Sequence, residues 1–459
     1  MSSSRNDNAD SIAAIATPLG QGGIAMIRLS GPQSLAIADA SFHPAGKSSK
    51  PSAAATHTLH FGRIIRQGLV VDEVLLSVMR APRTFTREDV VEITCHGGLL
   101  PAKMVLDTIL ENGARLAAPG EFTRRAFLNG RIDLAQAEAV ADLIHARTEL
   151  AATAAEEQLA GKLSQRINAL RDDLMKILAH VEAHIDFPDE DIAPDTREKL
   201  MARLQAALDF MDNLLRTAND GRLLRRGIRA AIMGRPNVGK SSLLNQLLGQ
   251  ERAIVSPTPG TTRDTIEETA SVRGVPIIFI DTAGLRQTED EIEAEGVRRS
   301  RHTLASAELI LHVLDASEPL AEWDQRLLKE YAGRPRLLIR NKADLPRRLE
   351  LPGGFAAIDV SCLTGAGIEE LKDAIKATVW DGGTSSEMLQ VMINSRHEDA
   401  LRRARDSTAR AVTALRDRLG LELAALDLRQ SAQAVGEIVG KTTTEDLLDS
   451  IFSQFCLGK

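Results

Sequence analysis

The segment Gly234–Ser241, with the sequence GRPNVGKS, constrains the fold of this chain most, because it matches the pattern GxxxxGK[ST]. It follows Ile228–Met233, an apolar run typical of a buried strand, and precedes Ser242–Leu248, a stretch typical of a helix. Glycines here let backbone N–H groups surround phosphate oxygens, Lys240 places a positive charge on the β- and γ-phosphates, and Ser241 offers a hydroxyl to Mg²⁺. The segment therefore predicts the P-loop of a nucleotide-binding α/β domain.

Two later motifs indicate which nucleotide binds. Asp281–Gly284 (DTAG) follows another apolar run, where a carboxylate can join the Mg²⁺ shell and a glycine N–H can approach the γ-phosphate. In Asn341–Asp344 (NKAD), the aspartate can accept hydrogen bonds from N1–H and the 2-amino group of guanine, a pair that adenine does not offer. Ser361–Leu363 resembles the loop that closes over guanine. The order of these motifs favours GTP over ATP and over a chance match. The residues that we expect to bind GTP on this basis are Asn237, Val238, Gly239, Lys240, Ser241, Asp281, Thr282, Ala283, Gly284, Asn341, Lys342, Asp344 and Ser361.

The residue pattern changes three times along the 459 residues. Residues 1–120 mix β-branched runs, such as Ile24–Leu29, with a helical stretch at Ala102–Leu110, as in an α+β domain. Residues 121–222 repeat apolar side chains at intervals of three and four, which predicts amphipathic helices. Residues 223–380 alternate strands and helices, as in a doubly wound parallel sheet, and 381–459 become helical again. We expect either one helical domain, discontinuous in sequence and split by an inserted G domain, or two unrelated helical regions.

Composition excludes several classes of protein. The 56 basic and 63 acidic side chains give a net charge of −7, which argues against a surface that is basic overall and binds nucleic acid. Aromatic residues at 3% argue against an extended base-stacking surface. The three cysteines lie too far apart to suggest a disulfide framework or a zinc site. No signal-peptide pattern or long apolar run is present in the sequence, so we expect a cytoplasmic protein with no membrane partner.

Several segments carry a resemblance to a known family. Gly260–Asp264 (GTTRD), Asp281–Arg286 (DTAGLR) and Phe455–Lys459 (FCLGK) resemble the MnmE/TrmE family of tRNA modification GTPases, which belongs to the TrmE-Era-like GTPases. Thr17–Gly23 and Pro119–Phe122 fit the same family. The resemblance therefore extends over nearly the whole chain and is more specific than that of a G domain alone.

The resemblance implies an N-terminal α+β domain that binds 5-formyltetrahydrofolate or a related one-carbon folate and forms a homodimer. It also implies that the G domains pair across the dimer when GTP and K⁺ are bound, so that hydrolysis drives a conformational change. Members of the family work with the flavoprotein MnmG in a heterotetramer or larger complex. Together they install an aminomethyl or carboxymethylaminomethyl group at C5 of the wobble uridine of certain tRNAs, with a folate-derived one-carbon unit.

The resemblance also assigns roles to individual residues. Leu285 stands where Ras-like enzymes carry the glutamine that orients the attacking water, and Glu293 matches the family glutamate proposed to replace it. Thr262 matches the threonine that binds Mg²⁺ together with Ser241. The remaining matches are Arg263 and Asp264 for activation; Asn237, Ser256, Thr258 and Thr261 for K⁺ beside GTP; and Arg28, Glu92, Arg131 and Lys459 for folate.

Some interpretations stay open at this point. Cys456 is either a residue with a chemical role or a small buried hydrophobe, and His180 and His184, spaced four apart, are either metal ligands or packed side chains. A ribosome-assembly GTPase is the alternative function, although no basic segment with a GXXG loop follows Trp380. A third possibility is a one-carbon enzyme in which the G domain only regulates.

Overall fold

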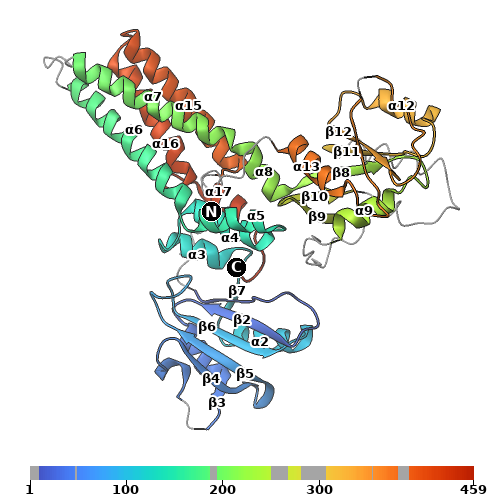
Figure 1. The fold of residues 1–459 in the computed structure, drawn as a ribbon. Coiled ribbons are helices and arrows are strands. Elements are labelled where there is room, and N and C mark those ends of the chain that lie inside the picture. The colour runs from blue at the N-terminus through green and yellow to red at the C-terminus, as the bar shows by residue number, and fades with distance from the viewer. Residues whose placement is uncertain are drawn as a thin grey trace. The chain divides into compact units, whose positions relative to one another are not determined.

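The computed structural model describes residues 10–46, 49–186, 194–249, 267–280, 306–353, 355–380 and 392–459 (Figure 1). The chain divides into two compact units, one formed by Met1–Ala141 with Gln433–Lys459 and the other by Asp142–Ala432. The predicted boundaries near residues 120, 222 and 380 remain a prediction, because one compact unit can hold more than one domain. Among the described residues, no helix is long and apolar enough to cross a membrane.

The N-terminal unit contains a seven-stranded sheet. All neighbouring strands are antiparallel except β1 and β7, which are parallel. The strand predicted at Ile24–Leu29 is confirmed to within one residue, and the helical stretch predicted at Ala102–Leu110 lies within a longer helix. The strand order is β3 (Phe42–Pro44), β4 (Thr58–Arg66), β5 (Leu69–Met79), β6 (Val90–His96), β2 (Ile24–Ser30), β1 (Ile12–Ile15) and β7 (Arg115–Leu116).

Helices pack on one face of this sheet. α1 (Ser34–Ser41) and α2 (Leu99–Glu111) contact the strands, and a one-turn helix, η1 (Pro51–Ala53), lies beside α1. Residues of β6 alternate, so that Ile93 is buried in the core with the helices whereas Glu92 lies on the opposite face. The alternation therefore places Glu92 and Thr94 of β6 on the face away from the helices.

The C-terminal segment completes the N-terminal unit. Leu448 and Phe452 of α17 (Glu445–Phe452) belong to one buried cluster with Leu134 of α4 (Leu134–His145), and α17 contacts α3 (Glu121–Leu128). Gly120 precedes α3 with φ +68°, and a Cβ there would lie 2.6 Å from the carbonyl oxygen of Phe452. The close approach therefore requires glycine at this position.

Helices form a large part of the second unit. α7 and α15 lie side by side (Figure 1). The amphipathic helices predicted for residues 121–222 are confirmed, and breaks follow His145 at the end of α4 and Leu159 at the end of α5. The helices of this region are α5 (Glu149–Leu159), α6 (Lys162–Asp186), α7 (Pro194–Arg216), α8 (Ala218–Arg226), α15 (Ser395–Arg416) and α16 (Leu421–Ile438), the last of which continues into the N-terminal unit.

A six-stranded sheet forms the α/β part of the second unit. Its order is β13 (Ala357–Asp359), β12 (Arg336–Asn341), β11 (Leu309–Asp315), β8 (Ile228–Met233), β10 (Val275–Phe279) and β9 (Glu268–Val272). The first five strands are parallel, but β9 is antiparallel to β10, so the sheet is mixed rather than wholly parallel as expected. The two strands are joined by the tight turn at Arg273 and Gly274, which leaves no room for a crossover helix. The doubly wound arrangement remains a prediction.

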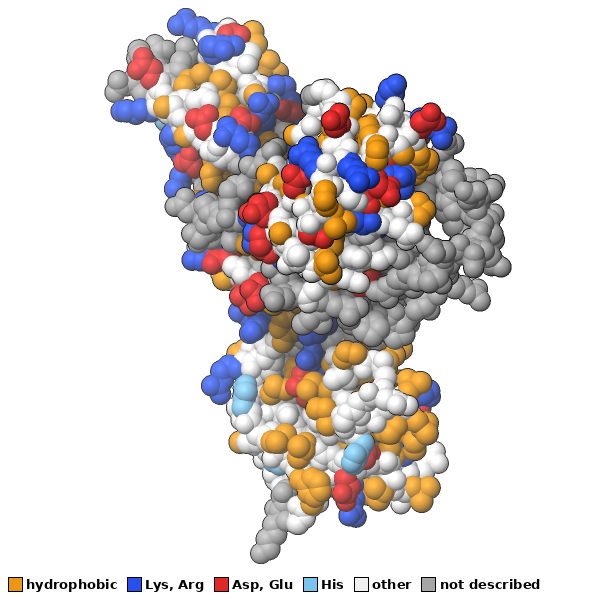
Figure 2. All heavy atoms as spheres, turned by 45° about the vertical axis from the view of Figure 1, so that its right-hand side comes forward, with side chains coloured by type: hydrophobic (Ala, Val, Ile, Leu, Met, Phe, Trp, Pro, Cys, Tyr) orange, Lys and Arg blue, Asp and Glu red, His pale blue; other side chains and the backbone are white. Residues whose placement is uncertain are grey.

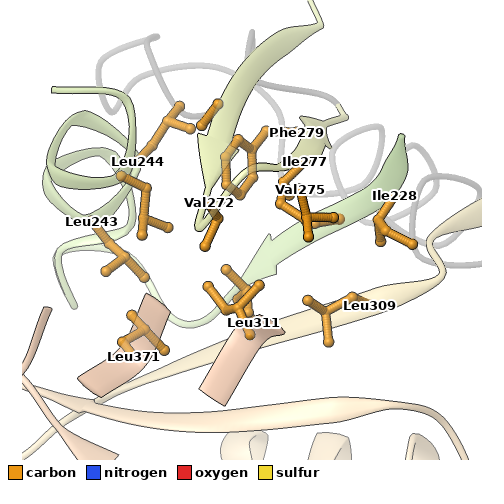
Figure 3. Packing of buried hydrophobic residues seen from close by; sticks show 14 of the residues in the cluster. Ile228, Leu243, Leu244, Val272, Val275, Ile277, Phe279, Leu309, Leu311 and Leu371 are labelled. Carbon is orange, nitrogen blue, oxygen red and sulfur yellow. The ribbon is translucent and has the colours of Figure 1, made fainter. Parts of the chain in front are cut away.

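The core of this part lies between the sheet and two helices, α9 (Lys240–Leu248) and α13 (Ile368–Val379) (Figure 3). Leu243 of α9 and Leu371 of α13 are buried in one cluster with Leu311 of β11. α12 (Glu322–Glu330) contributes to a second cluster, which includes Ile310 of β11. Because β8, β11 and β12 are parallel, their carboxyl ends meet at one edge, where the predicted nucleotide motifs begin.

Candidate functional site

The P-loop begins where β8 ends at Met233 and closes where α9 begins at Lys240. Gly239 has φ +96°, and a Cβ there would lie 2.1 Å from Nδ2 of Asn341. Asn237 also has a positive φ of 60°, a conformation that asparagine adopts more readily than most residues. The predicted strand–loop–helix context is therefore present, with backbone bends that only specific residues accept.

Lys240 lies at the start of α9 with its ammonium group turned back to the loop. Its Nζ donates a hydrogen bond of 2.8 Å to the carbonyl oxygen of Arg235. Burial lowers the pKa of Lys240 from its ordinary value. Ser241 follows in the first turn of the same helix, so both predicted phosphate and Mg²⁺ residues stand at a helix N-terminus, where anions are favoured.

Asn341 joins the P-loop to the predicted guanine loop. It is buried at the end of β12, its Nδ2 donates to the carbonyl oxygen of Val238 at 2.8 Å, and its Oδ1 accepts from the backbone N–H of Cys362 at 3.1 Å. One side chain therefore holds together three segments that are distant in sequence. The structure thus brings the phosphate and base motifs to one edge of the sheet.

The other guanine-motif residues are also positioned by hydrogen bonds. Ser361 Oγ donates to Oδ1 of Asp344 at 2.5 Å. Lys342 has φ +64°, and its Nζ lies 2.6 Å from Oδ2 of Asp315, at the end of β11. Burial raises the pKa of Asp315, but hydrogen bonds from Lys342 and Ser317 outweigh burial, so the net pKa lies below its ordinary value. Asp315 is thus held as a carboxylate beside the lysine.

Two residues of this site escape the motif pattern. Arg235 occupies a variable position of the P-loop motif, and Asp315 belongs to no motif. The signal for Asp315 is its place directly after the apolar run Leu309–Leu314, since a carboxylate at a strand's carboxyl end reaches the ligand edge of such a sheet. Arg235 carries no comparable signal in the sequence.

A large share of the predicted catalytic and cation residues lies outside the described part of the chain. These are Ser256, Thr258, Thr261, Thr262, Arg263, Asp264, Asp281, Thr282, Ala283, Gly284 and Glu293. Their roles in catalysis and in binding Mg²⁺ and K⁺ therefore stay predictions.

In the N-terminal unit, Arg28 and Glu92 form an ion pair. They lie opposite each other on β2 and β6, with Arg28 Nε 2.8 Å from Glu92 Oε1, and both side chains are largely buried. Nη1 of Arg28 also donates to the carbonyl oxygen of Gly458 at 3.0 Å, next to Lys459. The guanidinium lies over the ring of Phe122, 5.8 Å from its centre. Arg28 and Glu92 thus come together, and the backbone next to Lys459 lies beside them.

Arg131 contacts a phenylalanine that packs against the same aromatic cluster as Arg28. Its guanidinium lies 5.8 Å from the ring centre of Phe85. Phe85 packs against the buried cluster that contains Phe122. A separate, open hollow of about 560 Å³ in this unit is lined by Pro32, Ala81, Pro82, Arg87, Glu88, Asp89 and Asn129, and so by none of the four predicted folate residues.

The cysteines differ in their surroundings. Cys456 is exposed, whereas Cys95 and Cys362 are buried. Burial raises the pKa of both buried thiols to about 11, with contributions from Asp72 and Asp344 respectively. The structure therefore disfavours Cys95 and Cys362 as nucleophiles and leaves Cys456 accessible, without testing its chemical role.

The two histidines of α6 contact each other. The Nε2 atoms of His180 and His184 lie 3.2 Å apart, and their rings pack edge to face. Burial, with smaller contributions from His184 and Arg203, lowers the pKa of His180. Within the described ranges, no group of three or more histidine, cysteine, aspartate or glutamate side chains is placed to hold a metal ion.

Comparison with known proteins adds independent information. The family model described as the MnmE helical domain matches residues 134–456, and the model of the GTP-binding protein TrmE N-terminus matches residues 11–131. A Geobacillus kaustophilus relative named tRNA modification GTPase MnmE is 49% identical over 98% of this chain and 99% of its own length. A Bacillus subtilis relative with the same name is 46% identical over 98% of this chain and all of its own length.

Among solved structures, the G domain of the T. maritima FeoB iron transporter matches 33% of this chain and 98% of its own length, with 28% identity. Its TM-score of 0.25 is too low to carry an argument. The family models and the curated relatives, by contrast, extend over nearly the whole chain. This protein belongs to the MnmE/TrmE family of tRNA modification GTPases.

Proposed function

We propose that this protein is a K⁺-activated GTP hydrolase that acts in tRNA modification. The observation that carries the proposal is the junction at Asn341, whose side chain joins the P-loop to the guanine loop through Val238 and Cys362. With Lys240 and Asp344 on either side of this junction, one ligand that has both a phosphate chain and a guanine base satisfies both motifs. GTP is that ligand.

Mg²⁺ and K⁺ are the cations that we propose to bind with GTP, on the basis of the oxygen-bearing side chains in the predicted motifs. Ser241 and Thr262 would hold Mg²⁺, with Asp281 near its shell, and hydroxyl and carboxylate oxygens are the ligands that Mg²⁺ prefers. K⁺ would be held by Asn237, Ser256, Thr258 and Thr261 and would supply positive charge beside the β- and γ-phosphates, as an arginine finger does in other GTPases. Glu293 would position the attacking water, with Arg263 and Asp264 needed for activation.

A one-carbon folate is the proposed ligand of the N-terminal unit. The residues fit this group: Glu92 can accept hydrogen bonds from a pterin ring, and Arg28, Arg131 and Lys459 are cations suited to the carboxylates of a folate tail. Arg28 already lies between Glu92 and the carbonyl of Gly458, beside the ring of Phe122.

The outer face of the N-terminal sheet supports a homodimer. Phe61 of β4 and Leu75 of β5 are paired in register and exposed, and Leu59 is exposed two residues along β4. On the visible face in Figure 2, hydrophobic side chains gather on the N-terminal unit. Because exposed apolar patches mark interaction surfaces, we propose that a second copy covers this face. Glu92 pairs with Ser77, two residues from Leu75, so the proposed folate site shares this face.

The proposed partners are MnmG, in a heterotetramer or larger complex, and tRNA. Nucleoside mass spectrometry of tRNA from cells lacking this protein tests the function. We expect loss of the aminomethyl or carboxymethylaminomethyl group at C5 of the wobble uridine. Intact modification would refute the proposal and favour a ribosome-assembly GTPase.

GTP hydrolysis by the purified protein should also fall strongly when Na⁺ replaces K⁺, and equal rates would remove the role of Asn237.

A further inference from the structure

A buried carboxylate outside the nucleotide motifs holds the P-loop from behind. Asp324, on α12, has a side chain only 2% exposed, and its Oδ2 accepts a hydrogen bond of 2.8 Å from Nε of Arg235. Arg235 is the second residue of the P-loop, and its carbonyl oxygen is the acceptor for Nζ of Lys240. The contacts therefore run from α12 through Arg235 to the lysine of the phosphate site.

The same guanidinium has a second, weaker partner. Nη2 of Arg235 lies 3.1 Å from Oε2 of Glu318, whose side chain is 56% exposed. Since a solvated ion pair contributes little and a buried charged hydrogen bond contributes more, Asp324 is the contact that fixes Arg235. Glu318 provides a natural comparison, because it touches the same arginine from the solvent side.

The other oxygen of Asp324 has no hydrogen bond among the described contacts. Oδ1 faces Nε2 of His312 at 3.9 Å, too far for a hydrogen bond. His312, in the middle of β11, is fully buried, and neither of its ring nitrogens has a hydrogen-bond partner among the described residues. Because buried polar groups are nearly always paired, the hydrogen bond from Arg235 is the described contact that satisfies the carboxylate of Asp324.

α12 packs on the face of β11 that carries His312, where Leu327 and Tyr331 lie with Ile310 in one apolar cluster. The two oxygens of Asp324 thus face different elements, Oδ2 toward Arg235 of the P-loop and Oδ1 toward β11. The packing of α12 on β11 therefore fixes the position from which Asp324 holds Arg235.

We propose that Asp324 is a positioning residue of the nucleotide site, which holds the P-loop through Arg235. This inference rests on the phosphate site proposed above. While Asp324 holds Arg235, the carbonyl of Arg235 is in place to hold Lys240 in the phosphate site. Without Asp324, Arg235 and its carbonyl would be free to move.

The test is the rate at which the full-length protein releases a fluorescent N-methylanthraniloyl-GDP, chased with excess GDP. Binding of this probe by the unaltered protein first checks the phosphate site itself, so failure of the proposed function is seen separately. Asp324→Asn and Arg235→Ala should each release the probe about tenfold faster, because each removes a charged hydrogen bond. Glu318→Gln should release it at the original rate. Arg235 is partly exposed, so its variant keeps the test valid if the buried Asp324 variant fails to fold.

A positioning role also predicts which steady-state parameter of GTP hydrolysis changes, KM or kcat. The KM for GTP should rise about tenfold in Asp324→Asn, while kcat at saturating GTP stays within twofold. The reason is that the Asp324–Arg235 hydrogen bond affects how tightly the P-loop holds nucleotide and not the chemical step. A fall in kcat with KM unchanged, or equal release rates for the Asp324 and Glu318 variants, would overturn the positioning role.

Discussion

The guanidinium of Arg28 donates a hydrogen bond of 3.0 Å to the carbonyl oxygen of Gly458, 430 positions further along the chain. Arg28 lies in the second strand of the chain, and Gly458 is its second-last residue. The contact ties the C-terminal tail to the sheet beside Glu92, the ion-pair partner of Arg28. Tail position and the charge distribution of the proposed folate site therefore depend on each other.

Gly458→Ala tests this dependence. Gly458 has φ +89°, and a Cβ there would lie 2.6 Å from the carbonyl oxygen of Ile15, so the tail must move away from the sheet. We expect folate affinity, measured by calorimetry, to fall by about tenfold or more. Gly46→Ala is the matched control, since its φ is +67° but nothing lies within 4 Å of an added Cβ. Equal affinity in the two variants would show that tail position does not matter.

Arg125 should contribute strongly to the stability of the N-terminal unit. It is 1% exposed and pairs with Asp10, Glu88 and Glu121. Arg125→Met leaves the largely buried Glu88 without its cation, and Asp10 and Glu121 keep only Arg115, so the free energy of unfolding should fall by about 3 to 5 kcal/mol. Denaturant titration measures this loss.

Arg63→Met provides the control for Arg125, because Arg63 pairs with Glu73 in solvent. Its effect should stay under about 1 kcal/mol. A comparable loss in the two variants would mean that burial of the ion-pair network around Arg125 is not what matters.

The His96–Asp72 pair predicts a pH dependence of stability. The hydrogen bond that Nδ1 of His96 donates to Oδ1 of Asp72, at 2.6 Å, raises the pKa of His96 above its ordinary 6.5. Because the folded pKa is the higher one, the pair stabilises the fold fully below pH 6.5, and this contribution disappears as pH rises through the raised pKa. The difference in melting temperature between the unaltered protein and His96→Ala should therefore shrink from pH 6 to pH 8. A difference that grows over this range contradicts the assignment.

Asp344→Asn should change the preferred base. An amide in place of the carboxylate offers a donor to the C2 oxygen of xanthine and no longer accepts twice from guanine. We expect affinity for fluorescent GDP to fall by about tenfold or more, and affinity for the xanthosine analogue to rise. Asp359→Asn, at a half-exposed carboxylate on β13 that pairs with Arg340, should change neither affinity. An unaltered base preference in Asp344→Asn would remove the guanine assignment.

What the sequence predicts well is local. The bend of the P-loop depends on Gly239 and Asn237 within one motif, and the strand before it is a plain apolar run, so both are visible in the sequence. β9 was not predicted, because it is short and two of its buried residues, Glu268 and Thr269, are polar. Burial of polar residues on a strand erases the alternation that identifies one.

Contacts between distant segments could not be predicted from residue patterns. Arg28 and Glu92 are paired only by the register of β2 and β6, so their role came from family resemblance. Asp324 looks like an ordinary acidic residue in the first turn of a helix, and only its burial against Arg235 distinguishes it. Pairing and burial are properties of the folded chain that one sequence does not display.

The N-terminal unit combines the first and the last segments of the chain, so its two parts are synthesised at different times. Phe452 and Phe455, which pack with Leu134, emerge from the ribosome only after all of Asp142–Ala432 has been made. At a synthesis rate of about 5 to 20 residues per second, the first part of the unit waits roughly 15 to 60 seconds for its last helix. During this interval Leu134 lacks Phe452 and Phe455, so a chain that stalls near its end presents an apolar surface to chaperones and proteases.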